Sequence, residues 1–486
     1  MAITPRDEAD AANIGMIWKN AGWLGVVPIL LNFVALFSTG YITRRVGPEQ
    51  FGRFNLSFSL ITLTLIVTDL GLRALAVRDL ARGGRGARHE LNDLLSLRLM
   101  MALLAMMLAW LLAAGASWLG KPSLAHVMLI SSFGILPTAL TGTLTDGLIA
   151  RDKARITSVS TFWSGTLLTV ASVIAVAISP TELALATSYL VGPIVNMAML
   201  ARSSRTLYGP ARLRWRPRQW RVLVRRAIPF YRISIVGVVL GRIELPLIAA
   251  LFGDRMVGYY SAAMSLADRL SAVIDSVTTA ALPTLMRLGG DAKRITSVLA
   301  RIMYPLLGAL LAGAVMASTG TTAAVSVVFG AEYAAGGPAL AVGLFILPMN
   351  AMNALIFEGF VALRRVDFVA GTILRGQIVN GVLLLILVPS IGIIGGPVAK
   401  LLSGMTIALS RVEASRKAFP GLWSRVYLGP LSRRTLWALP VPFLVLFGHF
   451  RPLVTVLVAG GAFLVWVAAT ARTSGVLALL RPRAAP

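Results

Sequence analysis

Charged side chains inside long apolar segments are the residues of this chain that could perform chemistry. The basic ones are Arg242, Arg269, Arg375 and Lys400, and the acidic ones are Asp69, Glu244, Asp268 and Asp275. A guanidinium group can bind a phosphate with two parallel hydrogen bonds, and an ammonium group binds it as a point charge. A carboxylate in such surroundings can neutralise a base or exchange a proton. The pattern indicates binding of an anion, with acids for ion coupling or as counter-charges.

The apolar surroundings make these charges informative. An ionisable residue in the middle of a membrane helix costs about 2.5–3.5 kcal/mol on insertion scales, so it needs a partner or a wet cavity. Two interpretations stay open, structural ion pairs between helices and a cation-lined cavity with acids for ion coupling, and we favour the cavity. A second set of charges lies within about one and a half turns of predicted cytoplasmic helix ends, where an interfacial position explains them equally well. These are Arg73, Arg98, Asp146, Arg232 and Glu358.

The composition predicts that the apolar segments lie in a membrane. Hydrophobic residues make up 57% of the 486 residues. Charged residues make up 14%, against about 25% in soluble proteins. A helix of about 20 apolar residues crosses the roughly 30 Å of hydrocarbon, and helices satisfy their own backbone groups there. We place about fourteen spans, at 18–43, 54–77, 94–119, 124–150, 156–178, 181–201, 228–252, 259–286, 302–329, 338–362, 366–389, 391–411, 435–449 and 453–470.

The net charge of +26 comes mainly from basic residues in the loops between predicted spans. Lys and Arg gather in every second loop, after spans two, four, six, eight, ten and twelve, and in the C-terminal tail. Cytoplasmic loops carry such an excess, so both termini are predicted to be cytoplasmic. This topology explains the basicity without nucleic acid, which we do not expect as a partner.

The chain lacks the residues that several kinds of catalysis require. The chain has no cysteine, and its three histidines, His89, His126 and His449, are too scattered for a metal site. It contains no phosphate-binding glycine loop and no loop with paired carboxylates for hydrolysis. The acidic start "MAITPRDEAD" does not have the pattern of a cleavable signal peptide. We therefore expect no enzyme, no metal and no cofactor.

An internal repeat organises the spans. The stretch "RVGPEQFGRFNLSFSLITLT", from residue 45, resembles "LFGDRMVGYYSAAMSLADRL", from residue 251, at an offset of 206 positions. The offset pairs Gly47 with Gly253, Gly52 with Gly258 and Asp69 with Asp275. A second match joins "DGLIARDK" at 146–153 to "EGFVALRR" at 358–365. Because six spans separate the copies, both copies have the same orientation, as in parallel repeats related by an axis along the membrane normal.

The predicted fold is an all-α polytopic membrane protein with two six-helix lobes and a C-terminal helix pair. The predicted parts are a cytoplasmic N-terminus (1–17), an N-lobe (18–201), a basic linker (202–227), a C-lobe (228–415), a basic loop (416–434), spans 13–14 (435–470) and a cytoplasmic tail (471–486). The linker holds nine arginines and no acid. It could attract lipid headgroups or substrate, but an ordinary positive-inside loop explains it with fewer assumptions.

Three segments carry a resemblance to a known family. "NAGWLGVVPILLNFVALFSTGYITRRVGPEQFGRF", "GRIELPLIAALFGDRMVGYYSAAMSLADRL" and "VFGAEYAAGGPALAVGLFILP" resemble bacterial polysaccharide (O-antigen type) flippases of the multidrug/oligosaccharidyl-lipid/polysaccharide exporter superfamily, which have the MATE-like fold. The resemblance covers most of residues 14–415. It implies a V-shaped cavity, alternating access, a location in the bacterial inner membrane and an oligosaccharide on a polyprenyl diphosphate carrier as substrate. The resemblance implies membrane lipids as partners, and it leaves open a polysaccharide polymerase or ligase as a further partner.

One sequence feature and two alternative functions bear on the substrate. Superfamily members that flip the peptidoglycan precursor are expected to carry several bases in the first span, whereas this span offers Asn20 and Asn32, with Arg44 and Arg45 at its periplasmic end. We therefore favour another glycan. A drug or cation antiporter would need a more acidic cavity, and an assembly partner of a polysaccharide synthase that does not transport stays open as a further alternative.

The two repeat-related acids are expected to differ. Asp69 has Arg73 one turn away, so we predict a pair within its own helix. Asp275 shares a helix face with Asp268, so repulsion between like charges favours its protonated form and a role in proton coupling. In "GRIELP", Arg242 and Glu244 would point about 200° apart on one continuous helix, so we expect one of them to pair with a neighbouring helix.

The loop charges generate a direct test of topology. A reporter fused after residue 120 or 254 should be periplasmic, and one fused after residue 215 or 425 should be cytoplasmic. Alkaline phosphatase and green fluorescent protein fusions at all four sites measure this. Opposite signals would contradict both the topology and the repeat built on it.

Overall fold

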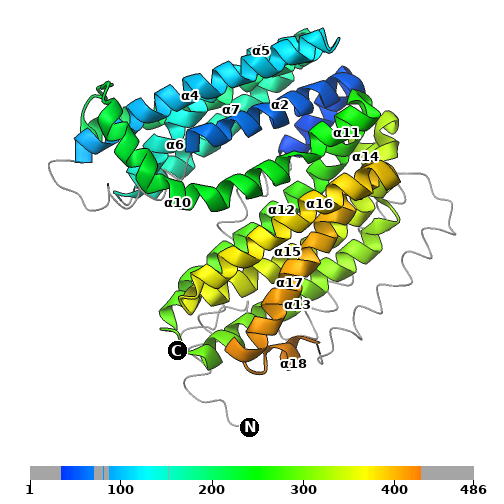
Figure 1. Ribbon diagram of the computed structural model, residues 1–486. Helices are drawn as coiled ribbons and strands as arrows, with labels where there is room; N and C mark the ends of the chain where they lie inside the picture. Colours follow the sequence, from blue (N-terminus) through cyan, green and yellow to red (C-terminus); the bar gives the residue numbers. More distant parts are fainter. Residues whose placement is uncertain (1–33, 70–79, 81–86, 152, 428–486) are drawn as a thin grey trace, which may run out of the picture. The chain divides into compact units, whose positions relative to one another are not determined.

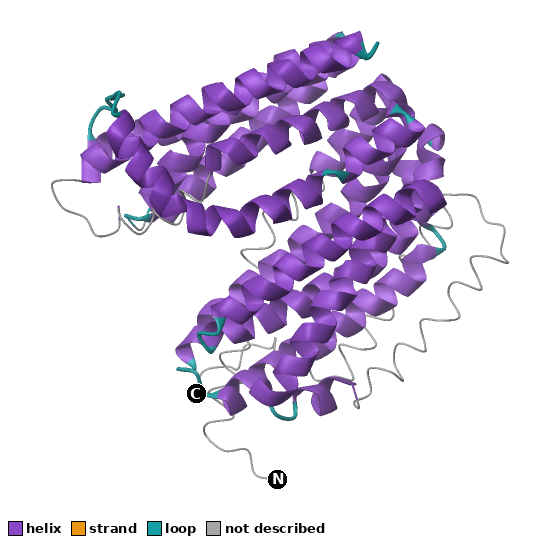
Figure 2. Ribbon diagram, in the orientation of Figure 1, coloured by secondary structure: helices purple, strands orange, loops and turns teal. Residues whose placement is uncertain are grey.

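The computed structural model describes residues 34–69, 80, 87–151 and 153–427, and all regular elements in these ranges are helices (Figures 1 and 2). The all-helical fold class is therefore confirmed. The predicted first span is described only from residue 34, and predicted spans thirteen and fourteen lie outside the described residues. The total of about fourteen spans and their grouping into two six-helix lobes stay predictions.

Eight segments of the described chain are long and apolar enough to cross a membrane. They are Pro48–Asp69, Arg88–Trp118, Pro122–Ile149, Arg155–Ile178, Glu182–Tyr208, Ala292–Ser318, Ala331–Ala362 and Gly371–Ala418. Their outer faces carry large apolar side chains that are exposed, such as Met107 (56%) and Leu111 (68%). Lipid covers such faces in a membrane protein, so the chain is a multi-pass membrane protein.

The chain folds into two compact units. The first covers Ser38–Gly258, and the second covers Tyr259–Pro486 together with Met1–Phe37. The helices of the first unit are α2 (Pro48–Asp69), α4 (Ala87–Trp118), α5 (Pro122–Ser132), α6 (Ile135–Ile149), α7 (Ala154–Ile178), α8 (Glu182–Tyr189), α9 (Val191–Tyr208), α10 (Pro217–Arg242) and α11 (Glu244–Phe252). Helix α12 (Asp254–Arg287) begins in this unit and continues into the second.

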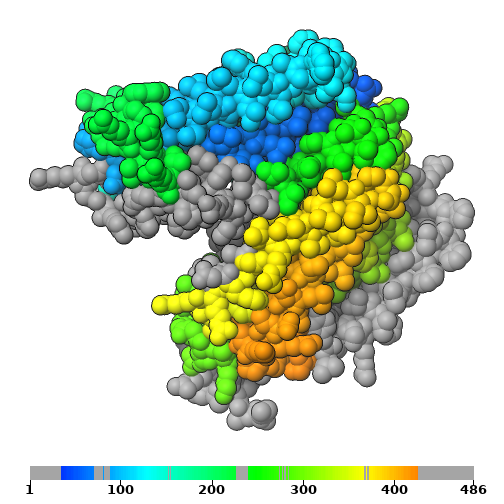
Figure 3. All heavy atoms as spheres, in the orientation of Figure 1, coloured from blue at the N-terminus to red at the C-terminus, as the bar shows by residue number. Residues whose placement is uncertain are grey.

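The second unit is built around two long helices in contact. Helices α16 (Val366–Ile391) and α17 (Gly395–Ala418) pack against each other, and α17 also packs on α15 (Gly337–Ala362). Their surfaces adjoin in Figure 3, where α16 is yellow and α17 is orange. The other elements are α13 (Ala292–Ser318), α14 (Thr321–Phe329), η1 (Ala331–Gly336), η2 (Gly392–Ile394) and α18 (Leu422–Tyr427).

Capping residues in the sequence explain several helix ends. Thr181 precedes α8, and its hydroxyl accepts a hydrogen bond from the Ala184 amide at 3.3 Å. Asp291 precedes α13 and accepts from the amides of Lys293 (3.0 Å) and Arg294 (3.2 Å). Such side-chain oxygens satisfy the amides of the first turn, which have no partner within the helix.

The structure corrects several predicted span boundaries. Helix α4 begins at Ala87 rather than at 94, because the polar residues of its first two turns fall outside an apolar window. The predicted span 302–329 is two helices, α13 and α14, which separate at Thr319 and Gly320. The predicted span 228–252 is interrupted at Ile243. Much of the predicted linker 202–227 is also helical, since α9 extends to Tyr208 and α10 begins at Pro217.

The repeated glycines lie at equivalent positions of the fold. Gly47 precedes α2 with a φ of 80°, and Gly253 precedes α12 with a φ of 83°, a left-handed conformation that favours glycine. A Cβ at Gly52 would overlap the carbonyl group of Asp254, whose carbon lies 2.8 Å away. A Cβ at Gly258 would overlap the carbonyl group of Pro48 in the same way, again with the carbon at 2.8 Å.

These two contacts are reciprocal. Pro48 and Asp254 are themselves related by the offset of 206, so the first turn of each helix presents a carbonyl group to the glycine of the other. Such a self-complementary contact has the form of a two-fold interface, here between two parts of one chain. The glycines of the repeat therefore mark the place where α2 and α12 touch backbone to backbone.

Alanine at either glycine should destabilise the protein. Gly52→Ala and Gly258→Ala should each cost about 1–3 kcal/mol, because the added methyl group meets backbone that cannot rotate away. Gly115→Ala in α4 is the matched control, since nothing lies within 4 Å of its Cβ position. Thermal unfolding of the purified variants, followed by tryptophan fluorescence, measures the effect. Equal melting temperatures for all three variants would contradict the close contact.

Candidate functional site

Two of the four predicted cations are half-buried and held by neutral oxygens. Arg269, on α12, donates a hydrogen bond from Nη2 to the backbone carbonyl of Ala35 at 3.2 Å. Lys400, on α17, donates from Nζ to the Tyr260 hydroxyl at 3.4 Å and lies 5.8 Å from the centre of that ring. Contacts to a carbonyl and a phenol orient the two positive charges.

The other two cations are exposed. Arg375 lies in the middle of α16, in the same compact unit as Arg269 and Lys400. Arg242 ends α10 and belongs to the first unit. Three of the four predicted cations therefore lie in the second unit, one each on α12, α16 and α17. Their role as substrate ligands stays a prediction.

The interruption at Ile243 changes the interpretation of Arg242 and Glu244. The angle of about 200° between them assumed one continuous helix, whereas Arg242 ends α10 and Glu244 begins α11. Glu244 is buried and Arg242 is exposed. A helix that is interrupted inside a predicted span places backbone groups and charges near its break, as in the discontinuous helices of transporters.

Two predicted acids lie on α12. Asp268 and Asp275 are both exposed, and they lie two turns apart on one helix. In the part of the chain that the structure describes, no ion pair to the Asp275 carboxylate is found. Proton coupling through Asp275 stays a prediction.

The best-defined charge cluster of the described residues is in the first unit. The Arg98 guanidinium, on α4, lies 3.1 Å from Asp69 Oδ1 on α2 and 3.6 Å from Asp146 Oδ2 on α6. Arg98 is 6% exposed and Asp146 is 2% exposed. Gly142 on α6 makes room for this arginine, because a Cβ there would overlap the guanidinium group. One buried base thus joins three helices, and we call these three residues the Arg98 cluster.

The Arg98 cluster bears on two predictions. Arg98 and Asp146 are buried within the protein, and the seven extra residues at the start of α4 place Arg98 three turns inside the helix. The described partner of Asp69 is Arg98 on another helix, whereas the predicted partner Arg73 lies outside the described residues. Sequence spacing finds pairs within a helix, but contacts between helices need the fold.

A second buried arginine was missed by the sequence analysis. Arg411, 3% exposed on α17, donates to the Asn353 backbone carbonyl at 2.7 Å and to Thr372 Oγ1 at 3.1 Å. Its guanidinium carbon also lies 5.7 Å from the centre of the Phe357 ring. It escaped notice because it was placed at the end of a predicted span. Arg411 joins α15, α16 and α17 and is buried among neutral groups.

The basic linker is anchored to protein. The backbone amides of Arg212 and Arg214 donate to Asn92 Oδ1 (3.0 Å) and Ser96 Oγ (2.8 Å) on α4. Trp220 is 4% exposed and packs in a core with Leu97 and other leucines. Docking of this segment on α4 explains the burial of Trp220, whereas Trp215 is 77% exposed.

Comparisons with solved structures define the class of fold. A structure of the lipid II flippase MurJ in an inward closed conformation matches with a TM-score of 0.75 at 14% identity, covering 93% of this chain and 99% of that one. An inward-facing multidrug resistance MATE family transporter of the MOP superfamily gives 0.62 at 13% identity, over 83% and 99%. The Vibrio cholerae MATE transporter VcmN in the bent form gives 0.53 at 14%, over 84% and 99%. The chain has the fold of these membrane transporters.

The sequence gives the family. The profile of the family described as "Polysaccharide biosynthesis protein" matches residues 17–288, which is more than half of the chain. The chain belongs to this family, which confirms that the predicted resemblance points to a polysaccharide family, and the solved structures show that the chain has the fold of MurJ and MATE transporters. A search of the curated proteins finds no match.

Loss of the Arg98 guanidinium should destabilise the first unit. Arg98→Ala leaves a buried acid without its base, a change that costs about 3–5 kcal/mol in buried pairs. Adding Asp146→Asn should recover part of that loss because it removes the stranded charge. Melting temperature measures this, with Arg155→Ala, an exposed arginine on α7, as the matched control. If Arg98→Ala melts like that control, the cluster contributes nothing to stability.

Proposed function

We propose that the protein moves an oligosaccharide, attached to a polyprenyl diphosphate carrier, from the cytoplasmic to the periplasmic leaflet. The observation that carries the proposal is membership in the polysaccharide biosynthesis family combined with cations on membrane-length helices. Arg242 and Arg375 are exposed, and Arg269 and Lys400 are half-buried, so a phosphate group can approach all four. This function makes the protein a transporter of the bacterial inner membrane with both termini in the cytoplasm, and it needs neither catalysis nor a cofactor.

The energetics explain why such a substrate needs a protein. A sugar hydroxyl that enters hydrocarbon without a hydrogen bond costs about 4 kcal/mol or more, and a charged diphosphate costs far more. Guanidinium groups that bind the diphosphate with paired hydrogen bonds remove much of this cost while the prenyl chain stays in lipid. Energy coupling through Asp275, with Asp69 as a structural counter-charge to Arg98, belongs to this proposal. So does a polymerase or ligase as a partner.

Transport into liposomes tests the proposal. The purified protein is reconstituted with a fluorescent oligosaccharide on polyprenyl diphosphate, and the fraction that a membrane-impermeant quencher reaches is followed with time. Alanine at Arg242, Arg269, Arg375 or Lys400 should slow the movement roughly 5- to 150-fold, as expected for loss of about 1–3 kcal/mol. Arg→Lys should rescue only partly, because lysine cannot form the bidentate contact.

Controls separate this proposal from the alternatives. Arg301→Ala, an exposed arginine on α13, should transport like the parent protein at equal abundance. Normal transport in all four candidate variants would return these charges to a structural role. Movement of an organic cation but not of the lipid-linked sugar would indicate an antiporter, and movement of neither would indicate an assembly partner.

A further inference from the structure

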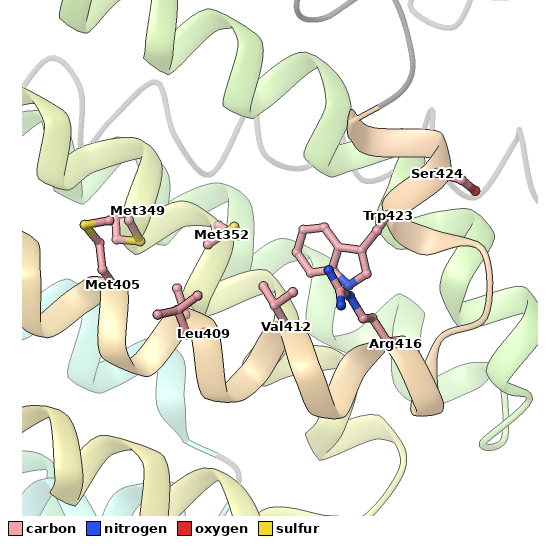
Figure 4. A pocket seen from close by; sticks show the side chains of 9 residues that line it. Met349, Met352, Met405, Leu409, Val412, Arg416, Trp423 and Ser424 are labelled. Atoms are coloured by element: carbon pink, nitrogen blue, oxygen red, sulfur yellow. The ribbon is translucent and has the colours of Figure 1, made fainter.

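An apolar groove with one basic end lies between α15, α17 and α18. Its volume is about 530 Å³, within the range of roughly 300–1,000 Å³ that ligand sites occupy. The lining residues are Met349, Met352, Met405, Ala408, Leu409, Val412, Arg416, Trp423 and Ser424. Figure 4 shows Met349 and Met405 at one end of the groove and Arg416 with Trp423 at the other. The groove is thus apolar along its length and cationic at its mouth.

Its length matches one leaflet of a bilayer. Met405 and Arg416 both line the groove and are eleven residues apart on α17, a distance of about 16 Å at roughly 1.5 Å per residue. Half of the roughly 30 Å of hydrocarbon is about 15 Å. By the predicted topology Arg416 lies at the cytoplasmic end of its span. A lipid of the cytoplasmic leaflet could therefore place its headgroup at Arg416 and an acyl chain along the methionines.

The mouth of the groove has the residues that such a headgroup needs. Arg416 is exposed, so its guanidinium group can reach a phosphate at the membrane surface. The Trp423 indole donates from Nε1 to Ser415 Oγ at 2.7 Å, which holds the ring beside the groove. Tryptophans are enriched where membrane helices meet lipid headgroups. Along the groove, Met405 and Leu409 (68% exposed) present apolar surface outward. Basic pockets between helices on the cytoplasmic side bind anionic lipid headgroups.

We propose that this groove is a binding site for one anionic phospholipid of the cytoplasmic leaflet, with its phosphate on Arg416 and an acyl chain on Met349, Met405 and Leu409. The flexible methionine side chains adapt to a chain of varying shape. The site is separate from the four candidate substrate cations and does not depend on transport. A polyprenyl carrier and the chain's own residues 428–486 are the competing occupants.

Photo-crosslinking in nanodiscs tests the site. The full-length protein is embedded in phosphatidylcholine with a small fraction of phosphatidylglycerol that carries a diazirine at the end of an acyl chain, and adducts are mapped by mass spectrometry. Adducts are expected on α15 near Met349 and on α17 between Met405 and Val412. A phosphatidylcholine probe should label these positions at least about fivefold less, the ratio expected for about 1 kcal/mol per basic residue.

Two neighbouring variants give the matched comparison. Arg416→Ala should reduce labelling about fivefold, whereas Lys417→Ala, which removes an equal charge outside the groove lining, should stay within about twofold of the parent protein. Equal labelling by both lipids, or equal loss in both variants, would overturn the proposal.

Competition with unlabelled lipids and cross-linking distinguish an anionic phospholipid from the other possible occupants of the groove. The proposal predicts that excess unlabelled phosphatidylglycerol removes the adducts. If polyprenyl phosphate removes them and phosphatidylglycerol does not, the groove binds the carrier and the proposal is wrong. The chain has no cysteine, so two introduced cysteines, one replacing Leu409 and one within 453–470, can form a disulfide cross-link without competing native thiols. Efficient cross-linking of that pair, with no lipid adduct, would assign the groove to the chain itself and equally overturn the proposal.

Discussion

Backbone contact between the first turns of α2 and α12 is the constraint that the repeated glycines place on the first unit. Gly52 and Gly258 allow the first turns of the two helices to touch, each against a carbonyl group of the other. Residues with side chains would separate the helix axes, since packed helices ordinarily lie about 8–10 Å apart. Helix α12 then extends into the second compact unit and carries Asp268, Arg269 and Asp275.

Each unit contains a buried arginine that joins three of its helices, and the two arginines have different kinds of partner. Arg98 joins α2, α4 and α6 through two acids, whereas Arg411 joins α15, α16 and α17 through a carbonyl, a hydroxyl and an aromatic ring. A base paired with acids is locally neutralised, and a base held by neutral groups keeps its positive field. The second unit also carries Arg269, Arg375 and Lys400.

Much of the fold could be predicted from sequence because the bilayer imposes simple rules. Apolar length predicted helices, and the offset between Gly52 and Gly258 predicted equivalent positions that the structure places in reciprocal contact. Helix ends and interruptions were less predictable. The polar start of α4 and the break at Ile243 carry no hydropathy signal, so the start of α4 was predicted too late and Arg242 and Glu244 were placed on one continuous helix.

The candidate site was less accessible to sequence reasoning than the fold. Deep charges were found by their type and place in apolar runs, but their partners belong to other helices. Asp69 was assigned to Arg73 because spacing within a helix is visible in sequence, whereas its contact with Arg98 requires the packing of α2 on α4. Arg411 was overlooked because its position at a predicted span end hid its burial by Asn353 and Thr372.

The contact of α2 with α12 can be measured directly in a membrane. Glu49 and Arg255 are exposed residues in the first turns of the two helices, and a chain without cysteine allows spin labels at Glu49→Cys and Arg255→Cys alone. Double electron–electron resonance in liposomes should give one short, narrow distance distribution, unchanged when a lipid-linked oligosaccharide is added. A broad distribution, or a second population at longer distance, would contradict a fixed backbone contact between α2 and α12 in the first unit.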